Sequence, residues 1–394
     1  METHHGGGAL RNPHDKACNP SRFLYTGLRN METSPRHGTQ TTPAAPRIEW
    51  VDILKGLAIL LVVVGHMEYA EGTANPGRIL IYSFHMPLFF MLAGYTAALS
   101  FSHNANLLKF VCRRFLSVMV PYICWMLALP CIYATTGEIS QYSFHDACLD
   151  IISGWGQWWF LPCLFILQLM FAAYHLLRRA VPGVFGAVAG FVILFACVFS
   201  INRFGGAYLS DSSLQIHYVL YTYRMFPAFA LGVALFEFPA VKSLVTHGRV
   251  IPLLAVVLFA LLCRDYAHFH KPYGWMLIGL AGCVIMLRLF CGISSAQTLA
   301  ANMGGMVLRQ CKRLGKSSMA IYVLSFLLIP ATPLFPDASS PQLAVFCGNL
   351  LLGLVICYAC VGLKAIINLS PLLSAAFLGE FPKRKKVEGS AVSK

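Results

Sequence analysis

Long apolar runs constrain this chain more than any other feature of its sequence. A helix needs about 20 apolar residues to cross a bilayer, because the hydrocarbon core is about 30 Å thick and each residue rises about 1.5 Å. Ten runs of roughly that length follow one another. They predict an all-α, polytopic membrane protein of about ten transmembrane helices. The runs are 51–69, 79–100, 115–134, 158–177, 183–202, 217–238, 250–268, 273–291, 317–333 and 343–365.

The composition supports lipid as the surrounding solvent. Hydrophobic residues make up 57% of the chain and charged residues only 12%. Soluble domains carry about 25% charged residues, so a soluble fold of this composition could not cover its surface. The lipid bilayer is therefore the first partner that the sequence predicts.

The basic residues are distributed asymmetrically between alternate loops. With the N-terminus inside, the outer loops hold only Arg78, Arg203, Arg264 and Lys271. The positive-inside rule then places both termini in the cytoplasm. This pattern accounts for the net charge of +14, so we expect no nucleic-acid binding. The inner segments hold Lys109, Arg113, Arg114, Arg178, Arg179, Lys242, Arg249, Arg309, Lys312, Arg313, Lys316, Lys383, Arg384, Lys385 and Lys386.

Three segments follow from this layout. Residues 1–46 are polar and lack the apolar stretch of a signal peptide, so they read as a disordered cytoplasmic extension. Met-Glu-Thr occurs at Met1 and again at Met31, which makes Met31 an alternative start. Residues 47–368 form the membrane domain, and residues 369–394 form a basic cytoplasmic tail. The 14 cysteines lie mostly in apolar runs. We expect neither a disulfide framework nor a metal site, and we interpret Cys357 and Cys360 as core thiols.

The first apolar run carries the most informative polar residues. Ionisable groups inside a span are costly and mark functional interiors. At 100° per residue, Lys55 and His66 differ by about 20° around the helix, and Asp52 lies about 40° from His66. All three therefore share one stripe, which must face protein or water. Asp52 can pair with Lys55, three residues on.

The position of His66 has two readings. It lies about 16 Å along the axis from Lys55, in the outer half of the membrane. A lone histidine there is often only a satisfied interfacial residue. Because His66 lies on the same side of the helix as Asp52 and Lys55, a functional site is the favoured interpretation. Lys55 would mark a positively charged entrance for an anionic donor, and His66 would be a base at the other end of the helix.

Other runs hold further candidates. His85 precedes Pro87, which kinks its helix, so His85 either lines a cavity or stabilises the kink. Arg113 and Arg114 fit ordinary topology and could also clamp phosphates. Arg224 lies inside a run and needs a partner, either Glu237 or a ligand, unless its side chain snorkels outward.

The outer side also carries candidates. Trp158 and Trp159 begin a run at the outer interface, where they form an aromatic belt or a platform for a sugar. The outer segment 135–157 is predicted to be a lid or a short interfacial helix. Its charged and titratable residues are Glu138, His145, Asp146 and Asp150.

Two motifs resemble those of the acyltransferase-3 family of membrane acyltransferases. The first is Asp52-Ile-Leu-Lys55-Gly56 followed by Val64-Gly65-His66, with a basic residue and a histidine separated by ten positions. The second runs from Phe84-His85-Met86-Pro87 to Gly94. That family commonly has serine before the glycine, where this chain has Ala93, so a hydroxyl at that position is not essential here.

Three further segments are similar to later regions of the family, and the likeness covers roughly residues 47–365. At the last of them many members carry a histidine, where this chain has Ser325. The segments are Arg113-Arg114-Phe115 to Pro121-Tyr122, Trp159-Phe160-Leu161, and Leu314-Gly315-Lys316-Ser317 to Ile321-Tyr322.

The resemblance implies an active-site cavity among ten spans in the plasma (inner) membrane of a bacterium. Acyl-CoA, usually acetyl-CoA, would donate from the cytoplasm to a hydroxyl of an envelope carbohydrate. His66 would be the general base or transient acyl carrier, with Asp52 orienting Lys55 and His85 assisting. Lys55, Arg113 and Arg114 would hold the phosphates of coenzyme A, and Arg224 is the last candidate for that role.

Two other functions remain open on the sequence. A secondary transporter would also carry polar residues in its spans, but it often shows matching interruptions in two halves, which this chain lacks. A non-catalytic partner in envelope assembly would share the motifs. The acceptor, the acyl chain length and the oligomeric state are not encoded in any feature that we can read.

Overall fold

The structure is a computed structural model in which the described part of the chain is almost entirely helical. It describes residues 48–67, 76–103, 106–136, 142–154, 156–205, 217–264, 272–296, 303–329 and 341–381. The predicted extension 1–46 and the last thirteen residues of the predicted tail lie outside these ranges. The helices are α2 (Glu49–Met67), α3 (Pro76–His103), α4 (Leu107–Arg114), α5 (Val120–Thr136), α6 (Phe144–Ser153), α7 (Phe160–Ala180), α8 (Gly183–Ser200), α10 (His217–Glu237), α11 (Pro239–Thr246), α12 (Val250–Arg264), α13 (Pro272–Ala296), α14 (Met303–Lys316), α15 (Ser318–Leu328), α16 (Gln342–Ile367) and α17 (Pro371–Leu373), with π-helical turns η2 (Phe115–Met119), η3 (Ile201–Gly205) and η4 (Ser374–Leu378).

The all-helical membrane architecture is confirmed, and each of the ten predicted runs contains a helix. Within the described ranges, six helices are long and apolar enough to cross a membrane. A seventh span results if the pair α10 and α11, bent by 109°, is one broken span. Shorter apolar helices within α12, α13 and α15 fill the other three runs. A total of ten spans, and the side on which each terminus lies, therefore stay predictions.

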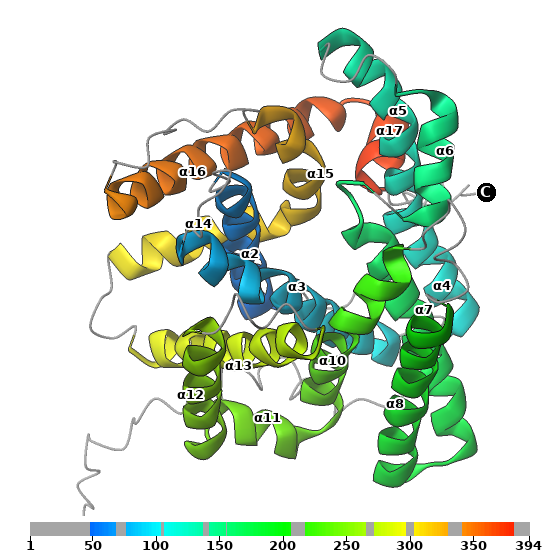
Figure 1. The fold of residues 1–394 in the computed structure, drawn as a ribbon, viewed down its shortest axis with the longest axis vertical. Helices are drawn as coiled ribbons and strands as arrows, with labels where there is room; N and C mark the ends of the chain where they lie inside the picture. Colours follow the sequence, from blue (N-terminus) through cyan, green and yellow to red (C-terminus); the bar gives the residue numbers. More distant parts are fainter. Residues whose placement is uncertain are drawn as a thin grey trace, which may run out of the picture.

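Helix α2 lies near the centre of the fold and packs against α3, α14, α15 and α16 (Figure 1). Two glycines allow the closest of these contacts. A β-carbon on Gly56 would overlap the backbone carbonyl of Cys311 in α14, and one on Gly315 would overlap that of Asp52. Small residues permit such close approach of helices in membranes. The first turns of α2 are therefore covered by α14, which carries Arg309, Lys312, Arg313 and Lys316.

Helix α3 has a similar contact with α10. A β-carbon on Gly94 would overlap the carbonyl of Phe229, and one on Gly232 would overlap that of Met91. Helix α10 ends at Glu237, and Pro239 then starts α11 at a sharp angle. A proline suits the first turn of a helix, because the missing N–H has no intrahelical partner there. The bend turns α11 across the end of the bundle.

The end of the described chain folds back onto α5. The indole N–H of Trp125 donates to the carbonyl of Phe377 at 2.9 Å, and Gly379 lies against the backbone of Ser117. Gly379 has φ of 64°, a conformation that glycine adopts without strain. Lys364 and Glu380 form an ion pair of 2.6 Å that closes this turn. Figure 1 shows α17 in red beside α5.

Candidate active site

The part of the polar stripe of α2 that precedes His66 faces neighbouring helices. Asp52 is 9% exposed, and Ile59 and Val62 on the same side of the helix are 0% and 3% exposed. Lys55 is half-buried. One carboxylate oxygen of Asp52 is buried and accepts no hydrogen bond from any described residue. A buried, incompletely satisfied carboxylate is uncommon and is typical of sites that bind or react.

Helix α14 supplies cations beside the first turns of α2. Lys312 Nζ lies 2.6 Å from Glu49 Oε1. Arg309, Arg313 and Lys316 are exposed on one side of α14. In the sequence alone, these residues were interpreted only as markers of topology. The signal that could have found them is Gly315, since a glycine beside a basic run permits close docking on another helix.

A small apolar pocket lies beside the first turn of α2, away from Lys55. Trp50, which lines it, lies about 140° around the helix from Lys55, so this pocket does not join Lys55 to His66. Its lining residues are Trp50, Tyr95, Leu235, Lys242, Thr246, Leu287 and Phe290.

Arg113 and Arg114 lie in a different part of the bundle. They end α4, which packs on α7 and η2. Arg113 is exposed, while the guanidinium of Arg114 lies 5.2 Å from the centroid of the Phe110 ring. Figure 1 places α4 on the opposite side of α2 from α14. The structure therefore does not bring these arginines together with Lys55.

His66 lies in the last turn of α2 and its side chain is exposed. The hydroxyl of Tyr82, from α3, lies 3.5 Å from His66 Nδ1. The guanidinium of Arg78 lies 5.0 Å from the ring of the same tyrosine, a favourable cation–π distance. His66 thus has a neighbour that can orient its ring.

His85 contacts the other side of Tyr82. Their ring centroids are 5.0 Å apart, and His85 is 4% exposed. Its Nδ1 lies 2.7 Å from the carbonyl of Ile81. A carbonyl can only accept, so Nδ1 carries the proton and Nε2 is left as an acceptor. This bond within α3 supports a role for His85 in stabilising the kinked helix, while the alternative that it lines a cavity stays a prediction.

The predicted pairing of Arg224 with Glu237 is wrong. The two residues are thirteen positions apart on α10, or about 20 Å along its axis. Glu237 instead pairs with Arg178 of α7, accepts a hydrogen bond of 2.7 Å from Tyr174, and lies 3.6 Å from His175. The Nε of Arg224 is buried and has no hydrogen-bond partner among the residues that the structure covers.

The two tryptophans of the fourth run are packed differently. Trp158 is 1% exposed and contacts Trp125 and Phe326, so it offers no free face for a sugar. Trp159 is half-buried and stacks on Tyr221 at 4.2 Å. Ser325, where relatives of the resembled family carry histidine, is 3% exposed and bonds only its own helix.

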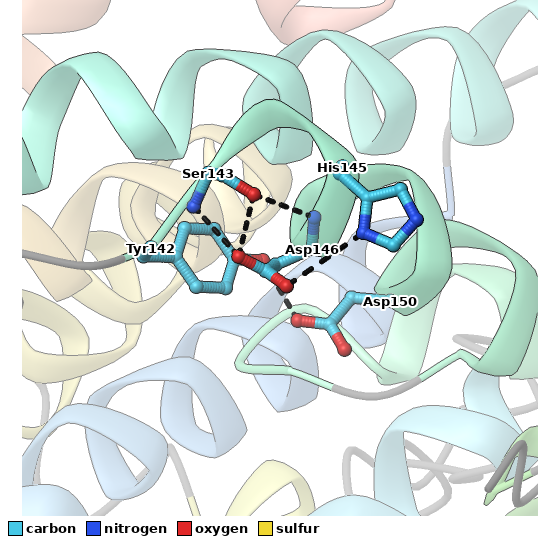
Figure 2. Close-up of polar contacts among 5 residues, drawn as sticks. All are labelled: Tyr142, Ser143, His145, Asp146 and Asp150. Carbon is cyan, nitrogen blue, oxygen red and sulfur yellow. Dashed lines mark hydrogen bonds and ion pairs between the residues drawn. The ribbon is translucent and has the colours of Figure 1, made fainter.

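Segment 135–157, which was predicted to lie outside, contains the short helix that the sequence offered as one alternative. Helix α6 exposes Phe144 and Ile152, as an interfacial helix would. Ser143 caps it through a reciprocal capping box with Asp146, and Figure 2 shows these bonds. The hydroxyl and N–H of Ser143 lower the pKa of the Asp146 carboxyl. Tyr142 donates to Asp150 at 2.7 Å, and burial, followed by this bond, raises the pKa of Tyr142.

Comparisons with protein families and with known proteins give two matches to this sequence. The family model described as "Acyltransferase domain" matches residues 48–362. The nodulation protein NolL of Sinorhizobium fredii (strain NBRC 101917 / NGR234) is 29% identical over 147 residues, which cover 32% of this chain and 37% of that protein. The chain thus matches little more than a third of that relative's length. No solved structure matches. The family match extends from the first turn of α2 into α16, and the chain therefore belongs to the acyltransferase-3 family.

Proposed function

We propose that this protein transfers an acyl group, acetyl in the simplest case, from acyl-CoA on the cytoplasmic side to a hydroxyl of an envelope carbohydrate. Family membership supports acyl transfer in a membrane. The donor, the acceptor and the direction across the membrane are our proposal.

The observation that carries the proposal is the stripe of α2. Lys55 and His66 lie about 16 Å apart on one side of this helix, and the residues between them on that side are buried. A cation at one end can hold a phosphate, while an imidazole at the other end can move a proton. A single extended thioester donor would place its phosphate at Lys55 and its acyl group at His66.

The donor end combines α2 and α14. Lys55 would bind a phosphate of coenzyme A, with Asp52 one turn away to orient the ammonium group. Arg309, Arg313 and Lys316 raise the positive potential beside it, which attracts polyanionic donors. Arg113 and Arg114 lie on α4, which packs on α7 and η2. They would therefore bind coenzyme A only through a second contact, separate from the one at Lys55.

The reaction takes place at His66. Its imidazole accepts the proton of the acceptor hydroxyl as that oxygen attacks the thioester carbonyl. The new C–O bond forms, the C–S bond breaks, and the proton passes to the departing thiolate as free coenzyme A. Tyr82 would hold the ring through Nδ1, which leaves Nε2 for the acceptor.

The test replaces His66 in cells that make the protein. A strain without the gene is complemented with the wild type, His66→Ala or the control His103→Ala, and envelope glycans are analysed by mass spectrometry. A general base contributes about 10²–10⁴-fold, so His66→Ala should lose the acyl increment that both other strains keep. Protein levels in the membrane fraction are measured alongside.

Two outcomes would reject the proposal. One is full acylation by His66→Ala protein at normal abundance. The other is uptake of a solute by proteoliposomes that contain the purified protein and no acyl-CoA, which would favour a transporter. An acyl-imidazole trapped on His66 of the wild-type protein would instead assign His66 as the acyl carrier.

A further inference from the structure

A series of contacts runs from α3, one turn after His85, toward helix α6. One turn after His85, the ring of Phe89 lies 5.9 Å from that of Phe160 in α7. Phe160 in turn contacts Tyr322 of α15 at 5.3 Å. The hydroxyl of Tyr322 donates to the backbone carbonyl of Gln157 at 3.1 Å. These contacts connect α3, α7 and α15.

Beyond Gln157 the contacts become polar. Its side-chain amide donates to the hydroxyl of Tyr133 at 3.2 Å. The rings of Tyr133 and Tyr142 meet edge to face at 5.4 Å, and Tyr142 donates to Asp150 at 2.7 Å. The hydroxyl of Tyr122 also donates to the backbone carbonyl of Asp150, at 3.2 Å. Figure 2 shows the Tyr142–Asp150 end of this series.

The residue types in this network suit a molecule rich in hydroxyl groups. Aromatic rings provide apolar faces with a polar tip, and amide and carboxylate groups donate to or accept from hydroxyls. Gln157 is exposed, and Asp150 and Tyr142 are half-exposed, so a ligand can reach them. No lysine or arginine belongs to the network, which distinguishes it from the cationic end of α2.

We infer that Gln157, Tyr142 and Asp150 form the site that binds the carbohydrate acceptor. This inference rests on the proposed function and assigns the acceptor to a definite part of the fold. Gln157 contacts the acceptor through its exposed amide. Tyr142 is a positioning residue, because its hydroxyl holds the carboxylate of Asp150.

The experiment uses the full chain in lipid nanodiscs with acetyl-CoA. The acceptor probes are the methyl glycosides of glucose, galactose, mannose, fucose and rhamnose, and the best acetylated of them is used for kinetics. Gln157→Leu should raise the KM of that glycoside about tenfold, since one hydrogen bond is lost, and should leave the KM of acetyl-CoA within twofold. Tyr142→Phe, which keeps the ring, should raise the KM of the glycoside several-fold.

Thr135→Ala is the matched control, because Thr135 lies two residues after Tyr133 on the same helix and its hydroxyl donates to the carbonyl of Ile132. Melting temperatures of all variants are measured to detect misfolding. An unchanged KM of the glycoside in both Gln157→Leu and Tyr142→Phe would overturn the inference and leave acyl transfer intact. Equal increases in the KM of both substrates would also overturn it. Failure of the wild type to acetylate any glycoside would instead reject the proposed carbohydrate acceptor.

Discussion

The contact between α2 and α14 gives a prediction of defined size. In Gly315→Ala, the added methyl group would overlap the backbone carbonyl of Asp52, which cannot rotate away as a side chain could. The helices must therefore separate. Overpacking of this kind costs about 1–3 kcal/mol. The displacement of α14 should also move its cations relative to Lys55 and raise the KM of acyl-CoA.

Gly362→Ala in α16 is the matched control. This glycine is also helical, but a β-carbon there would meet no atom within 4 Å. The gain in helix propensity, about 0.5–1 kcal/mol, is common to both variants and cancels in the comparison. At about 2 °C per kcal/mol, Gly315→Ala should melt roughly 2–6 °C below Gly362→Ala. Equal melting temperatures, measured by thermal unfolding in detergent, together with equal KM values would refute the close docking.

Three other perturbations test separate parts of the fold. Arg178→Leu should cost about 3–5 kcal/mol, because it leaves the buried carboxylate of Glu237 without its arginine partner, whereas the double variant with Glu237→Leu should recover most of that loss in thermal unfolding. Ser143→Ala should remove about 1 kcal/mol of capping energy from α6, seen as faster hydrogen exchange confined to its first turn. Because the pKa of Asp146 is lower in the folded state, its contribution to α6 is fully present above the usual aspartate value near pH 4 and is lost as the pH falls through the lowered pKa. The protection factors of the α6 amides, which correct for the intrinsic pH dependence of exchange, should therefore fall only at acidic pH, and a fall between pH 5 and 7 would contradict this assignment.

Much of the helical architecture was predictable, because apolar length is a strong local signal. Each predicted run contains a helix, and the ends of the stripe on α2 follow directly from helical periodicity. The sharp turn between α10 and α11 was not predicted. Pro239 marks the start of a new helix, but the angle between two helices depends on packing that one sequence does not display.

The candidate site was predictable only where its residues share one helix. Asp52, Lys55 and His66 needed only the pitch of α2. The neighbour of His66, Tyr82, comes from another helix and required the tertiary fold. The pairing of Arg224 with Glu237 failed for a related reason, since the sequence shows that two charges exist but not which helices bring them together. The roles of Arg113, Arg114 and Lys55 in binding the donor stay predictions.

The fold-back of the chain end onto α5 has a consequence for biogenesis. Trp125 and Phe377 are separated by about 250 positions, so that hydrogen bond can form only after all the helices between α5 and η4 have been synthesised. The translocon must release α5 with this side still uncovered, and this packing step must await the synthesis of η4. A premature stop codon after α16 would therefore leave an early helix incompletely packed, even though every apolar run had already been inserted.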